Sequence, residues 1–221
     1  MTSLVFDRGP RPILRGWLHV GAAVAAAVAG ILLVVVASMR AESTATVTAT
    51  AIYAACLTAT MAVSGIYHRW RFRSLKSVTA WRRADHAMIA VFIAGTYGPI
   101  ATSVLPPDTA IRLLIMCWAG ALAAVIVNVA WIGHPRWVDV VIYLFLGWLI
   151  IWEVPALVAG AGWTVTILLA VGGIIYSIGA LFYGLKWPNP SPRWFGFHEV
   201  FHAGTIIAAI LHYIAIWLVV W

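Results

Sequence analysis

The sequence predicts an all-α, polytopic membrane protein in which a bundle of seven helices crosses the bilayer. Of its 221 residues, 63% are apolar and 10% are charged, and the mean hydropathy is +0.97. Soluble domains carry about 25% charged residues, so lipid is the solvent that this composition fits. The apolar residues also form long runs, and a span needs roughly 20 of them. We therefore divide the chain into a cytoplasmic N-terminal segment, 1–15, and one domain, 16–221, that contains all seven spans.

Each predicted span is bounded by a short break with turn or charge signals. Because no water satisfies the backbone in the bilayer core, every span is expected to be helical. The opening MTSLVFDRGPRPILRG is too short and too interrupted by proline for a signal-peptide core, so the first span is expected to be retained. In order, the spans and the breaks that end them are 16–38 (MRAEST), 45–67 (HRWRFRSLKSVTAWRRAD), 86–104 (LPPDT), 111–132 (GHPRW), 138–158 (AGAG), 163–184 (KWPNPSPRW) and 199–220.

The basic residues orient these spans. With the N-terminus inside, twelve of the fourteen Lys and Arg residues fall on the cytoplasmic side, and only Arg40 and Arg112 fall outside. The positive-inside rule favours this orientation, and an odd number of spans then places the C-terminus outside. The net charge of +7 is therefore explained by topology, and nucleic-acid binding is not expected. The predicted location is the plasma membrane.

Polar residues that are far apart in the sequence should meet at the cytoplasmic ends of three spans. The second span ends in SGIYHRW with Ser64 and His68, and Asp85 precedes the third span. The seventh span begins with His198 and His202. Residues four apart share a helix face, so these two histidines can bind one ion. His68 can supply a third nitrogen from the facing helix.

Three histidines with an open fourth position describe a catalytic zinc site. The open position would hold a water molecule whose pKa falls to about 7. Asp85 would accept a hydrogen bond from that water or act as general base, and Ser64 would bond the substrate or the aspartate. Cys56 and Cys117 each lie inside an apolar run, so neither a disulfide framework nor a thiolate zinc site is expected.

Simpler interpretations of the polar residues stay open. Asp85 precedes an apolar run, so it has the alternative role of capping the third span. Ser64 has the alternative of bonding the carbonyl four residues earlier. His86 is expected at the membrane interface, Asp139 at a helix terminus, and Glu199 facing loop water.

Five ordered motifs resemble those of the hemolysin III family of bacteria: SGIYHRW, ADHAMIAVFIAGTYGPI, YLFLGW, GGIIYSIGALFYGLKWPNP and FGFHEVFHAGTIIAAILHY. This family is related to the progestin and adipoQ receptors and, more distantly, to the alkaline ceramidases. The resemblance covers nearly the whole chain after residue 12. It implies a bacterial membrane, seven spans with the N-terminus inside, and a zinc ion on His68, His198 and His202, with Asp85 reached through water. Receptor signalling is not expected to carry over, because the chain lacks the long N-terminal domain of the animal receptors.

Three functions are then in question. The first is a zinc-dependent hydrolase of lipid amides or esters, open to the inner leaflet. The second is a non-enzymatic membrane protein in which zinc is structural and which serves lipid sensing or membrane homeostasis. The third, a pore-forming cytolysin, ranks lowest, because a chain this apolar should stay in the membrane that made it. A membrane lipid is the expected substrate or ligand, and the sequence names no protein partner.

Overall fold

The computed structural model describes residues 11–40, 43–131 and 133–221. Residues 1–10 of the predicted cytoplasmic segment, including Arg8, therefore lie outside the described part of the chain. Most of the described residues are helical. They form no strand, only an isolated bridge between Ser191 and Phe195. The helices are α1 (Trp17–Arg40), α2 (Thr44–Arg69), α3 (Leu75–Val104), α4 (Pro107–Ala130), α5 (Arg136–Gly147), the 3₁₀-helix η1 (Leu149–Glu153), α6 (Val154–Leu185) and α7 (Phe197–Val220).

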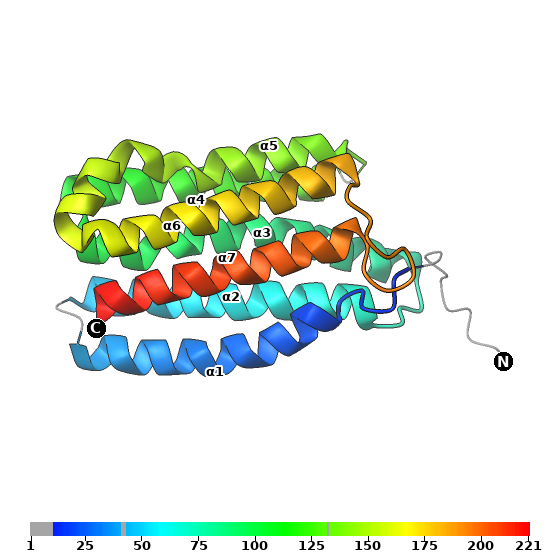
Figure 1. Cartoon of the computed structure of the whole chain (residues 1–221), viewed down its shortest axis with the longest axis horizontal. Coiled ribbons are helices and arrows are strands. Elements are labelled where there is room, and N and C mark those ends of the chain that lie inside the picture. Colours follow the sequence, from blue (N-terminus) through cyan, green and yellow to red (C-terminus); the bar gives the residue numbers. More distant parts are fainter. Residues whose placement is uncertain (1–10, 41–42, 132) are drawn as a thin grey trace.

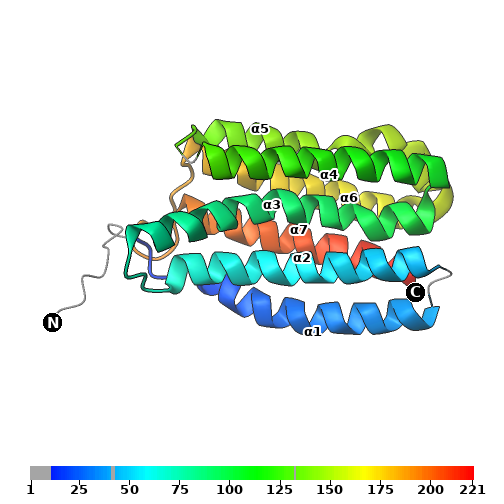
Figure 2. The same ribbon diagram turned by 180° about the vertical axis from the view of Figure 1, so that it is seen from behind.

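The helices form an elongated bundle and run roughly along its length (Figure 1). The start of α1, the loop from α2 to α3 and the loop from α6 to α7 lie at one end of the bundle, and the C-terminus lies at the other (Figures 1 and 2). These loops carry many of the basic residues. Helix α1 packs along α2, α2 along α3, α3 along α4, and α6 along α7.

Six stretches of the described chain are long and apolar enough to cross a membrane. Five are the single helices α1, α2, α3, α4 and α7, and the sixth is the 50-residue stretch Arg136–Leu185, which contains α5, η1 and α6. This stretch folds back on itself. The indole N–H of Trp148 donates to Ser177 Oγ at 3.0 Å, and a Cβ at Gly184 would lie 3.4 Å from Val140 Cγ2. The predicted spans 138–158 and 163–184 both fall within it.

The prediction of one continuous helix over 138–158 is wrong. The chain leaves the α-helical path after Gly147, passes through η1, and shows a second break at Gly162, where φ is +76°. The Tyr97 hydroxyl lies 2.7 Å from the carbonyl oxygen of Leu146 and 2.9 Å from that of Gly147. Carbonyls freed where α5 ends are thus bonded inside the bundle, as an apolar solvent requires.

Helix α3 begins well before the predicted third span. The Ser74 hydroxyl accepts a hydrogen bond from the backbone N–H of Ser77 at 3.2 Å and caps the helix. Asp85 consequently lies about three turns inside α3. The interpretation of Asp85 as an N-cap is wrong, and its burial needs another explanation.

The bundle also has the close helix packing and the apolar exterior of a membrane protein. A Cβ at Gly30 would lie 3.0 Å from Ala54 Cβ, so small residues let α1 and α2 approach closely. Large apolar side chains point outward, among them Ile31 at 66% exposure and Phe145 at 69%. Such a surface is stable in lipid, whereas in water it would be an aggregation site.

Candidate metal centre

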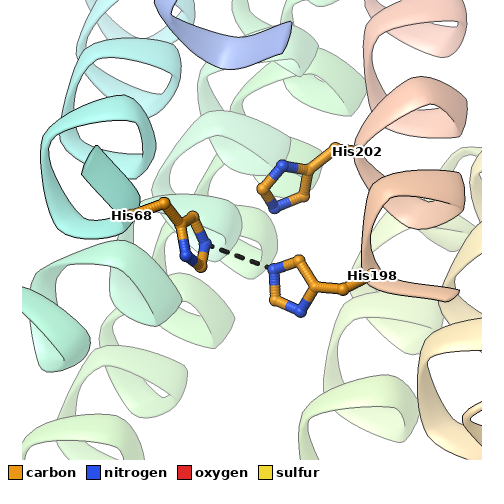
Figure 3. A group of neighbouring side chains, drawn as sticks. All are labelled: His68, His198 and His202. Atoms are coloured by element: carbon orange, nitrogen blue, oxygen red, sulfur yellow. Dashed lines mark hydrogen bonds between the residues drawn. The ribbon is translucent and has the colours of Figure 1, made fainter. Parts of the chain in front are cut away.

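Three histidines converge at the end of the bundle where α1 starts. His68 comes from the last turn of α2, and His198 and His202 come from the first turns of α7. The three imidazoles point toward one another (Figure 3), and one ring nitrogen from each lies within 4.8 Å of the others. The Nε2 atoms of His68 and His198 are 3.2 Å apart. His68 and His202 are buried, and His198 is half-buried. The structure thus brings together the three histidines that the sequence selected.

Local features place the two α7 histidines. Gly196 precedes the helix, and its N–H donates to Glu199 Oε2 at 2.8 Å, which fixes where α7 begins. The other carboxylate oxygen of Glu199 accepts from Arg15, and the Glu199 residue has no exposed surface. The expectation that Glu199 faces loop water is therefore wrong. Its carboxylate is buried because one oxygen caps the start of α7 and the other binds Arg15 in the segment that precedes α1.

Asp85 and Ser64 lie beside the histidines. Asp85 Oδ2 is 3.7 Å from His68 Nε2, and both residues are less than 10% exposed. Ser64 and Asp85 line the same cavity. Ser64 itself is 3% exposed. All five site residues chosen from the sequence therefore share one neighbourhood, although α2, α3 and α7 supply them separately.

A second polar cluster adjoins this neighbourhood, and sequence reasoning missed it. His86 Nδ1 lies 3.0 Å from Asp139 Oδ2, and the Tyr143 hydroxyl donates to Asp139 Oδ1 at 3.2 Å. His134 Nε2 is 3.6 Å from the same Oδ1. Asp139 is in the first turn of α5, as predicted, but it is 1% exposed. It serves as a buried acceptor between α3 and the start of α5, which the spacing along the chain could not reveal.

A fourth histidine also reaches the site. His19, in the first turn of α1, is 4% exposed, and its ring stacks on that of His202. Nothing in its surrounding sequence, WLHVGAA, marks it as a site residue. His19, Ser64, Asp85, His198 and His202 all line one small cavity of about 30 Å³. This is room for one or two water molecules.

A larger apolar cavity of about 140 Å³ lies next to the small one. It extends between α3, α5, α6 and α7, and its walls are mainly aliphatic and aromatic. The two cavities share the side chains of Thr60, Ile89, Tyr143 and Thr205. The apolar cavity therefore adjoins the histidine site.

Comparison with known proteins places the chain in a family. A model of the family described as haemolysin-III related matches residues 8–213. The chain belongs to this family. It is similar to the hemolysin-3 homolog of Bacillus subtilis (strain 168), with 37% identity over 102 residues, and to hemolysin-3 of Bacillus cereus, with 33% over 102 residues. Each match covers 45% of this chain, and 46% and 45% of those relatives, respectively. The matched segment thus spans about half the length of the curated relatives.

Family membership and the apolar helices together define a multi-pass membrane protein with bacterial relatives. Within it, the histidine cluster fits a metal ion by its donor set. Nitrogens bound tetrahedrally at 2.0–2.1 Å lie about 3.3 Å apart, and the His68 and His198 nitrogens are already 3.2 Å apart. One ring nitrogen from each of the three histidines lies within 4.8 Å of the others, so the cluster could hold a metal ion.

Proposed function

We propose that this protein is a zinc-dependent hydrolase of lipid amides or esters, with its site near the cytoplasmic leaflet. The observation that carries the proposal is the convergence of three imidazoles beside Asp85 and Ser64, next to an apolar cavity. Imidazole nitrogen suits zinc, and three protein ligands with one open position are typical of catalytic rather than structural zinc.

The chain's own residues have separate tasks in this reaction. When bound, the zinc ion would supply Lewis acidity and activate water at neutral pH. Asp85 takes the proton from the attacking water and returns it to the leaving amine or alcohol, so one water cleaves one C–N or C–O bond. Ser64 lines the same small cavity as Asp85 and would hydrogen-bond the substrate or the Asp85 carboxylate. The apolar cavity holds the acyl chain and excludes bulk water.

The same proposal includes a topology of seven crossings in a bacterial plasma membrane, with the N-terminus inside. The doubling back of Arg136–Leu185 supports two crossings within that stretch. The clustering of basic residues in the segments that flank the histidines supports a cytoplasmic site.

A second candidate function is non-enzymatic, with zinc as a structural tie. Helices α1 and α3 both pack against α2 and against α7, so they separate these two ligand-bearing helices along much of the bundle. An ion on His68, His198 and His202 would join α2 to α7 directly. Lipid sensing or membrane homeostasis would then depend on the stability of this joint.

Metal analysis combined with a lipid assay tests the two candidates. Purified protein in detergent is analysed for zinc, and then incubated with a set of long-chain lipid amides and esters while released fatty acid is measured. We expect one zinc per chain and release that a chelator abolishes. Zinc without hydrolysis of any substrate would support the structural role, and protein that binds no zinc would refute both candidates.

A further inference from the structure

The ring of His19 lies flat against the ring of His202. Their centroids are 3.9 Å apart and the planes are inclined by 10°. The two residues come from opposite ends of the chain, one from α1 and the other from α7. His202 is 3% exposed, so the stack is enclosed by protein rather than by lipid or water.

The start of α1 contacts both helices that carry the histidine cluster. On the α2 side, a Cβ at Gly65 would lie only 3.0 Å from Val20 Cγ2. On the α7 side, Arg15 pairs with the buried Glu199, and the N–H of Ile13 donates to the carbonyl of Arg193 at 2.9 Å. His19 is thus held in place from both sides, independently of its own contact with His202.

The stack with His19 restricts the orientation of the His202 ring. A metal-bound histidine almost always donates its second ring N–H to an acceptor, which fixes the plane of the ring. His202 Nδ1 is buried and has no hydrogen-bond partner among the described residues. A different contact must therefore prevent the ring from turning, and the face of His19 is the one that lies parallel to it.

We infer that His19 is a positioning residue that holds the His202 imidazole in the orientation needed to bind the metal ion. The inference rests on the proposed metal binding but not on catalysis. Because the flat face of the His19 ring makes this contact, an aromatic side chain at position 19 should preserve metal binding, whereas an aliphatic side chain should not.

Two variants of the full chain distinguish the contribution of the ring face from that of the ring nitrogens. His19→Phe keeps an aromatic face without the nitrogens, and His19→Leu has neither. Zinc affinity is measured by competition with a chromophoric chelator, and the visible spectrum of the cobalt-loaded protein reports the coordination geometry. We expect His19→Leu to lower zinc affinity roughly 10–100-fold, the usual effect of losing an outer contact. His19→Phe should stay near the wild-type affinity and spectrum.

The matched control is Tyr213→Phe, which removes another contact between α7 and α1, the hydrogen bond to the Ala29 carbonyl at 3.0 Å. It should leave zinc affinity unchanged. If His19→Leu does not yield helical protein, His19→Gln replaces it as the variant without a ring. Wild-type affinity in the variant without a ring overturns the inference, and so does a loss in His19→Phe as large as in His19→Leu, because a nitrogen would then be required. A wild-type protein that binds no zinc would instead refute the metal centre itself.

Discussion

Replacing Gly16 by alanine should destabilise the end of the bundle that holds the histidines and weaken metal binding. Gly16 has a φ of +80°, a left-handed conformation that costs an alanine about 1–2 kcal/mol. The added Cβ would also lie 2.6 Å from His68 Cβ and 3.1 Å from Arg69 Cγ. Overpacking of this kind costs about 1–3 kcal/mol. Together these terms predict that the free energy of unfolding falls by about 2–5 kcal/mol.

The clash also pushes on His68, so zinc affinity should fall together with stability. The assay is thermal unfolding of the purified protein in detergent, with and without zinc, followed by chelator competition. Gly21→Ala is the matched control, because nothing lies within 4 Å of its Cβ position and its φ is not positive. Since alanine favours the helix by about 1 kcal/mol over glycine, this control should be neutral or stabilising. A Gly16→Ala protein with the midpoint and zinc affinity of Gly21→Ala would refute the reasoning.

Three further predictions follow from the site and the topology. Either His198→Ala or His202→Ala should remove most of the zinc and lower thermal stability, because an ion that binds only the folded form stabilises it; unchanged metal content in both would contradict the proposed site. Asp85→Asn should keep the fold and the zinc but slow lipid hydrolysis roughly 10²–10⁴-fold, since asparagine retains the shape and loses the basic oxygen; full activity with full zinc would remove Asp85 from the mechanism. A periplasmic reporter fused after Trp221 should be active, and a fusion active only in the cytoplasm would show that the C-terminus lies inside.

Much of the helical fold could be read from the sequence, because the relevant signals are local. Apolar runs of about 20 residues identify the helices that are stable in lipid, and breaks between them fall near the ends of α1, α2, α3, α4 and α6. The spacing of His198 and His202 is also local, since residues four apart on a helix share a face. Their meeting with His68 could be predicted once the direction of each helix was assigned.

Other features depend on tertiary contacts and could not be read from these patterns. The predicted span 138–158 contains no break that marks the end of α5, and this end is seen only in the structure, where Tyr97 of α3 bonds the freed carbonyls. Asp85 resembled a cap because it precedes an apolar run, whereas the actual start of α3 is set by Ser74. The residue that bonds the end of α5 lies on another helix, and the residue that caps α3 lies about three turns before Asp85.

The sequence by itself thus predicted a helical membrane protein whose second, third and seventh spans bring three histidines, an aspartate and a serine together at one side of the membrane. Only the tertiary structure decided what surrounds them: the stack of His19 on His202 and the burial of Glu199 by Arg15. These pairs join residues more than 180 positions apart. The physical reason is that helix periodicity and hydropathy specify which face of a helix turns inward, but not which side chain of another helix it meets there.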